Sequence, residues 1–82
     1  MPVLAKFGGI VIRLLCLHPM GARLHAFYGD EELIVDVDDV RVVSGWAPDR
    51  VARQVLAWAR QHRREILDRF IAQDAEWSAS HP

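Results

Sequence analysis

The stretch ELIVDVDDVRVVSGWAPDR, residues 32–50, contains the change from extended to helical structure that decides the fold. Within ELIVDVD, residues 32–38, the leucine and valine side chains fall on one face, which is the pattern of a half-buried strand. An Asp-Asp pair then favours a tight turn, because short aspartate side chains bond their own backbone. VRVVS, residues 40–44, is therefore predicted to return as the next strand, and Gly45 ends the extended pattern.

The segments before this stretch predict two more strands. GIVIRLLCL, residues 9–17, is β-branched and aliphatic with a single charge, which favours a largely buried strand over a short helix. HPMGA, residues 18–22, contains proline and glycine and is expected to form a loop. Side chains then alternate over residues 23–28 before a turn at Gly29. Strands therefore occupy about residues 9–44 as a series of hairpins.

The residues after this region predict one long helix over about residues 48–73. Pro48 suits the first helical turn, because its φ is preset and it lacks an amide hydrogen. Side chains at helical spacing form a largely apolar stripe that should lie on the sheet. The stripe consists of Val51, Val55, Ala59, His62 and Ile66. The tail, residues 74–82, loses this pattern and is expected to fray.

The predicted fold class is therefore α+β. A small antiparallel sheet of about four strands is expected to pack against one long C-terminal helix. Residues 1–82 are expected to form a single domain, because no repeat, linker or second core is visible.

Composition limits what kind of protein this chain can be. Its 82 residues suffice for one thin core, and a formal net charge of −1 indicates no bulk attraction to a particular partner. The single cysteine, Cys16, excludes a disulfide framework and a multi-cysteine zinc site. The apolar segment near the N-terminus is interrupted by Arg13 and is shorter than the ~20 residues that span a bilayer. We expect a cytoplasmic protein without a metal or cofactor and without a membrane partner.

One side of the predicted helix carries a row of arginines. The row consists of Arg50, Arg53, Arg60 and Arg64. Guanidinium groups in such a row could contact the phosphates of a nucleic acid, which makes RNA a candidate partner. No aromatic side chain stands among them to stack on bases, so a solvated charged face is the alternative interpretation.

A second, apolar line on the helix consists of Leu56, Leu67 and Ile71. A small sheet covers only one side of a helix, so these side chains predict a further contact. A homodimer or a partner protein would bury them.

Carboxylates concentrate in the sheet region within ten residues of the chain: Asp30, Glu31, Glu32, Asp36, Asp38 and Asp39. They could hold a divalent cation, but their spacing lacks the glycine and the distal glutamate of a calcium loop. The alternative is an outward sheet face and turn that keep the domain soluble. Charge is thus segregated along the chain, and attraction between the acidic and arginine-rich regions of two copies is a further possibility.

Two histidines are candidates for chemistry. His62 falls within the apolar helical stripe, where an imidazole needs a hydrogen-bond partner, and Trp58 one turn earlier could wall a pocket around it. If the strand that holds His25 lies beneath this part of the helix, the two histidines could approach each other, with Asp36 or Glu65 orienting one of them. Such a set could perform general acid–base chemistry or bind a metal. The alternative is a satisfied core histidine beside a half-buried tryptophan.

Four segments together resemble a bacterial family catalogued as domain of unknown function 4160. They are MPVLAKFGGIVIR, RLHAFYG, SGWAPDR after a strand, and VLAWARQHRREILDRF, in this order over about residues 1–70. The resemblance implies a small cytoplasmic bacterial protein, often encoded beside another small protein and suspected to belong to a toxin–antitoxin-like pair. It implies no established activity.

The chain departs from the family's most recognisable motif, which is histidine, any residue, histidine, alanine. Arg23 stands where the family has its first histidine, while His25 and Ala26 are kept. Arginine stays protonated and does not ligate metals. Arg23 and His25 could therefore hold a phosphate or a carboxylate in place of a metal.

These features together predict a component of a toxin–antitoxin-like module that binds RNA or a protein. The protein partner would be the product of a neighbouring gene or a second copy. One alternative is a metal-independent ribonuclease in which His25 is the general base and His62 the acid. Another is a purely structural homodimeric module. Binding is favoured over catalysis.

Overall fold

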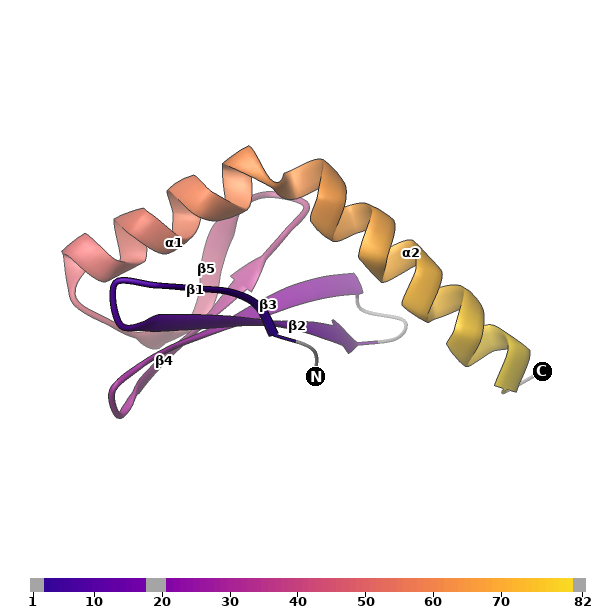
Figure 1. The fold of residues 1–82 in the computed structure, drawn as a ribbon, viewed down its shortest axis with the longest axis horizontal. Coiled ribbons are helices and arrows are strands. Elements are labelled where there is room, and N and C mark those ends of the chain that lie inside the picture. Colours follow the sequence, from indigo (N-terminus) through magenta and orange to yellow (C-terminus); the bar gives the residue numbers. More distant parts are fainter. Residues whose placement is uncertain (1–2, 18–20, 81–82) are drawn as a thin grey trace.

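A computed structural model of the protein describes the backbone of residues 3–17 and 21–80, and within them the side chains of residues 3–14 and 22–72. The elements follow in the order β1 (Val3–Phe7), β2 (Ile10–Leu17), β3 (Gly21–Tyr28), β4 (Glu31–Asp36), β5 (Arg41–Trp46), α1 (Asp49–Gln61) and α2 (Arg63–Ser80). The strands form one antiparallel sheet in the order of the chain (Figure 1). The predicted α+β class is confirmed, whereas four strands and one long helix are not.

The strand absent from the prediction is β1, at the edge of the sheet. Gly8 and Gly9 have φ values of 54° and 78°, so they form a tight turn that only residues tolerant of positive φ make easily. Phe7 pairs directly with Ile10 on the other side of this turn. The strand is only five residues long and carries a lysine, so its apolar pattern alone is weak. The Gly-Gly pair between two apolar segments was the available signal.

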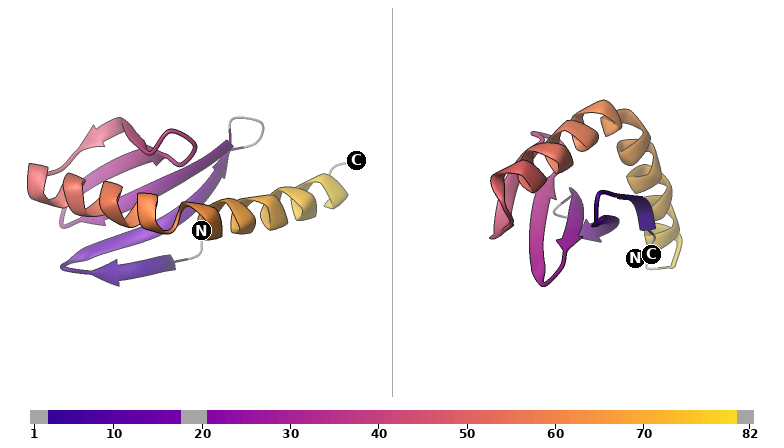
Figure 2. Two further views of the ribbon diagram at one scale, coloured as in Figure 1. Left: turned by 90° about the horizontal axis from the view of Figure 1, so that it is seen from above. Right: turned by 60° about the vertical axis from the view of Figure 1, so that its left-hand side comes forward.

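The core lies between one face of the sheet and the two helices. Figure 2 shows α1 and α2 on the same side, crossing the strands obliquely. The buried side chains of the sheet are Ile10, Ile12, Leu14, Ala22, Leu24, Ala26, Leu33 and Val35, those of the helices are Val51, Val55, Ala59 and Ile66, and those of the connecting segments are Val37 and Ala47. The predicted alternation in the strands and the predicted helical stripe are therefore confirmed, except that His62 is only partly buried.

The predicted single helix is divided at His62, where the direction of the chain changes (Figure 1). His62 has φ −108° and ψ 14°, away from helical values. Its backbone N–H donates to the carbonyl oxygen of Trp58 at 3.0 Å, and its ring Nδ1 lies 2.9 Å from the same oxygen. A side chain that bonds into the helical ladder is a recognised cause of a bend. Beyond it, α2 continues to Ser80, past the predicted end at Gln73.

Gly45 brings β5 into register with β4. Its φ is 87°, and a Cβ atom at this position would collide with the carbonyl oxygen of Glu32. Only glycine allows this conformation and this close approach of two backbones. Leu33 therefore pairs with Gly45, and Glu32 pairs with Trp46. Over the part of the chain that the structure describes, no helix is long and apolar enough to cross a membrane.

Candidate functional site

The face of the sheet that points away from the helices is the first candidate site. Side chains alternate along a strand, and directly paired residues of an antiparallel ladder share a face. Among the residues whose side chains the structure describes, the pairing of β2 to β5 places eleven on this side. We call them the open face: Val11, Arg13, Arg23, His25, Phe27, Glu32, Ile34, Asp36, Arg41, Ser44 and Trp46.

His25 lies near the centre of the open face. Its side chain is 15% exposed, and its ring centroid lies 5.9 Å from that of Phe27. Nδ1 is 3.8 Å from Oε1 of Glu32, a distance that allows an ion pair when the ring is protonated. Nε2 is buried and finds no hydrogen-bond partner within the described residues. One side of the imidazole is thus oriented by a carboxylate, and the other side is unsatisfied.

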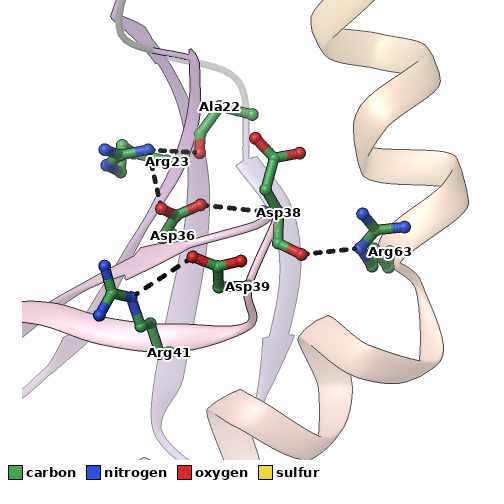
Figure 3. Close-up of polar contacts among 7 residues, drawn as sticks. All are labelled: Ala22, Arg23, Asp36, Asp38, Asp39, Arg41 and Arg63. Carbon is green, nitrogen blue, oxygen red and sulfur yellow. Dashed lines mark hydrogen bonds and ion pairs between the residues drawn. The ribbon is translucent and has the colours of Figure 1, made fainter.

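Arg23, predicted to bind an anion together with His25, is engaged within the sheet. Its Nη1 lies 3.6 Å from Oδ2 of Asp36 and donates to the carbonyl oxygen of Ala22 at 3.3 Å (Figure 3). The Arg23 and Asp36 side chains are 16% and 13% exposed, so this pair is largely shielded from water. Oδ1 of Asp36 accepts a further hydrogen bond from the backbone N–H of Asp38 at 2.9 Å. The charge of Arg23 is therefore balanced by Asp36.

A pocket at the bend between the helices is the second candidate site. It has an empty volume of about 250 Å³ and is lined by Leu4, Trp58, His62, Glu65, Ile66 and Arg69. The rings of Trp58 and His62 stack with centroids 4.5 Å apart and planes 22° apart. Because a carbonyl oxygen can only accept, Nδ1 of His62 donates the hydrogen bond to Trp58 O, and in a neutral ring Nε2 is then the acceptor. Trp58 and His62 therefore lie side by side in the lining of this pocket.

The structure does not bring the two histidines together. His25 lies between Leu24 and Ala26, whose side chains are buried under the helices, so its own side chain points to the opposite side of the sheet. His62 lies on the helical side. Neither Asp36 nor Glu65 orients His25, because the carboxylate beside it belongs to Glu32. The sheet itself separates the predicted base from the predicted acid.

The predicted nucleic-acid residues Arg53, Arg60 and Arg64 are exposed. Arg60 belongs to α1 and Arg64 to α2, so the bend divides the predicted row. Arg50, the remaining member of the predicted row, and Arg63 beside the row make contacts within the domain. Arg50 Nη2 donates to the hydroxyl oxygen of Tyr28 at 3.2 Å, and Arg63 Nε donates to the carbonyl oxygen of Asp38 at 3.3 Å (Figure 3).

The predicted partner line on the helix is less exposed than we expected. Leu56 and Leu67 are partly buried and pack against the core. Ile71 is 63% exposed. A larger exposed apolar group occurs on β5, where Trp46 is 62% exposed and is accompanied by Val42 and Val43.

The acidic residues of the predicted cluster occupy β4 and the turns before and after it. Among the side chains that the structure describes, no three or more groups are arranged to hold a metal ion. Asp39 Oδ2 lies 3.6 Å from Nε of Arg41 in an exposed ion pair (Figure 3). The side chain of Cys16 and the end of the predicted tail, residues 81–82, lie outside the described parts.

Sequence analysis missed the roles of Phe27, Glu32 and Trp46 as neighbours on one face. Glu32 was counted only as one of a cluster of carboxylates. The signal was the two-residue turn at Gly29 and Asp30, which pairs Tyr28 with Glu31 and hence Phe27 with Glu32. The irregular register of β5 could not be read from the sequence, so the position of Trp46 required the structure.

Comparison with known proteins gives a family but no characterised relative. The family described as Domain of unknown function (DUF4160) matches residues 9–70, which include both candidate sites apart from Leu4. No curated protein and no solved structure matches the chain.

Proposed function

The chain belongs to the family described as Domain of unknown function (DUF4160), and we propose that it is the binding component of a two-protein, toxin–antitoxin-like module. In this proposal the protein binds its partner through the open face and does not catalyse a reaction. The partner is a small protein encoded by a neighbouring gene. The observation that carries the proposal is a sheet face that neither α1 nor α2 covers, with Trp46 62% exposed at its edge.

The open face carries the apolar and aromatic side chains that are typical of a protein interface. Val11, Phe27 and Ile34 are only partly buried there, and Trp46 at its edge is 62% exposed. A buried polar atom without a partner costs about 1–3 kcal/mol. Because Nε2 of His25 is covered within the free domain, a bound protein would reach it only after the covering side chains move. Exposed tryptophan beside partly buried aromatic and aliphatic side chains is typical of the central contacts of interfaces.

The separation of the two histidines argues against the ribonuclease alternative. General acid–base cleavage needs both groups within reach of one substrate. His25 and His62 lie on opposite sides of the sheet, so one phosphodiester could not contact both. The arginine row offers phosphate contacts, but the bend divides it and the described side chains place no aromatic platform within it.

Co-expression with the neighbouring gene's product tests this proposal. The two proteins should co-elute in size-exclusion chromatography, and Trp46→Asp should abolish co-elution. Ile71→Asp is a closely matched control, because Ile71 and Trp46 have nearly equal exposure on different surfaces. Loss of the complex with Ile71→Asp and its retention with Trp46→Asp would show that the partner binds the helices and not the open face. Separate elution of the wild-type proteins, self-association of this chain alone, or co-elution with RNA in place of the protein would each contradict the proposal.

A further inference from the structure

Three side chains of the open face lie in one row across three strands. Phe27 of β3 pairs with Glu32 of β4, and Glu32 pairs with Trp46 of β5. Neighbouring strands are about 4.8 Å apart, so the two aromatic residues start from backbones roughly 10 Å apart, with the carboxylate midway between them. An aromatic ring, a carboxylate and a second aromatic ring thus follow one another along this row.

The three side chains differ in how accessible they are. The Glu32 side chain is 43% exposed and Trp46 is 62% exposed, whereas Phe27 is partly buried. A group that approaches the face therefore meets the carboxylate and the indole first, with the phenyl ring at one side. Glu32 is not screened by burial, and its Oε1 already orients toward Nδ1 of His25.

Acidic residues gather near one end of this row. Asp30 and Glu31 lie in or next to the turn that joins β3 to β4, two and one positions before Glu32. Among the arginines of the open face, Arg23 is balanced by Asp36, and Arg13 lies in the neighbouring row, where it pairs with His25. The open face therefore carries charges of both signs, and the carboxylate of Glu32 is the group of this row that attracts a cation.

We propose that Phe27, Glu32 and Trp46 form a binding site for the cationic side chain of an arginine or lysine that the partner protein inserts. A cation is attracted to an aromatic face within about 6 Å of the ring centroid, and the backbones of Phe27 and Trp46 are roughly 10 Å apart, so a guanidinium or ammonium group held at the Glu32 carboxylate is within reach of both rings. Glu32 supplies the opposite charge, and a guanidinium can bond a carboxylate through two parallel hydrogen bonds. This inference rests on the proposed function, because it names the group by which the partner binds.

A side chain of a protein fits the site better than a free small cation does. The row lies on a sheet face and has no enclosing walls, so a small molecule would gain few contacts there. Val11 of β2 pairs with Phe27 and extends the row, and Ile34 lies in the neighbouring row; both would contact the residues that flank the inserted side chain. Charged anchors that insert between aromatic groups frequently dominate the affinity of protein interfaces.

Two short peptides test the site without the partner. Acetyl-Gly-Arg-Gly-amide carries the cation, and acetyl-Gly-citrulline-Gly-amide has almost the same shape without the charge. Binding is followed by nitrogen-15 NMR of the backbone amides and of the indole N–H of Trp46, which is assigned with Trp46→Phe. We expect the arginine peptide to shift the signals of the row with a millimolar Kd and the citrulline peptide to bind at least about fivefold more weakly.

Variants then locate the site on the row. Glu32→Gln and Trp46→Ser should each weaken the arginine peptide by about fivefold to tenfold. Glu31→Gln is the matched control, because Glu31 is adjacent but alternates to the other face, and it should leave the Kd within about twofold. Equal binding of the two peptides, equal effects of Glu32→Gln and Glu31→Gln, or no shift at millimolar peptide would overturn the site.

The co-elution experiment and the peptide titration test the proposed partner and the cation site independently. Co-elution that is lost with Trp46→Asp, together with peptides that do not bind, would keep the interface and remove the cation site. Specific binding of the arginine peptide without any complex with the neighbouring protein would keep the cation site and remove the proposed partner.

Discussion

The ring of His25 is oriented by Glu32 on one side and is unsatisfied on the other: Nδ1 lies 3.8 Å from Oε1 of the glutamate, while Nε2 is buried without a described hydrogen-bond partner. This arrangement is poorly suited to stability alone. A leucine in the same place would fill a similar volume without a polar atom to satisfy. The histidine is therefore better explained by binding than by folding.

We expect His25→Leu to raise the free energy of unfolding of the isolated protein by about 1 kcal/mol, because it removes a buried unsatisfied nitrogen. The same substitution should weaken co-elution with the partner. Urea unfolding followed by circular dichroism measures the first effect. A loss of stability of similar size would show that Nε2 is satisfied in the folded protein and that the residue is structural.

At His62 we expect the substitution by leucine to lower the free energy of unfolding, the opposite of its effect at His25. His62→Leu removes the Nδ1–H donor to Trp58 O and the stacked contact with the indole, so the free energy of unfolding should fall by about 1 kcal/mol. The same urea titration checks it. A stability gain at both positions would mean that the His62 ring adds nothing at the bend.

Arg23→Gln should destabilise the protein by about 1–2 kcal/mol, because it leaves the shielded carboxylate of Asp36 without its ion pair. Arg53→Gln is the control, since this arginine is exposed on α1, and it should change the free energy of unfolding by less than about 0.5 kcal/mol. Thermal unfolding of the two variants under one set of conditions compares them. Equal effects would show that the Arg23–Asp36 pair contributes no more than an ordinary surface charge.

Gly45→Ala should cost at least about 3 kcal/mol, because the added Cβ meets the carbonyl oxygen of Glu32 and the backbone has a positive φ. Gly29→Ala is the matched control. Its φ of 58° is also positive, but nothing lies within 4 Å of the added Cβ, so only the conformational cost of about 1–2 kcal/mol applies. Similar losses at both glycines, measured by urea unfolding, would contradict the close approach of β4 and β5.

Much of the fold follows from local pattern. The alternation in ELIVDVD placed Leu33, Val35 and Val37 in the core, and all three are buried. The helical stripe was predicted for the same reason, since apolar spacing decides which side of an element faces the core. These are properties of short segments, which a sequence displays directly.

The features that the sequence did not predict correctly depend on contacts between segments that are distant in the chain or in different elements. The bend at His62 arises from a side-chain contact with Trp58 O that helix propensity does not reveal. The separation of His25 from His62 follows from which face of β3 the helices cover, and the prediction assumed the other face. The row through Glu32 needed the register of three strands, including the irregular pairing of β5.

The ladders at both borders of the sheet are interrupted. The pairing of β1 with β2 shifts register between Val3 and Ala5, and that of β4 with β5 shifts between Ile34 and Val35. Such irregularities twist an outer strand, so that a further strand cannot easily pair with its free edge. The sheet is consequently a poor seed for lengthening by further chains, whether in a fibril or by strand addition. A partner that binds the sheet as proposed would therefore contact its broad face and would not extend it at an edge strand.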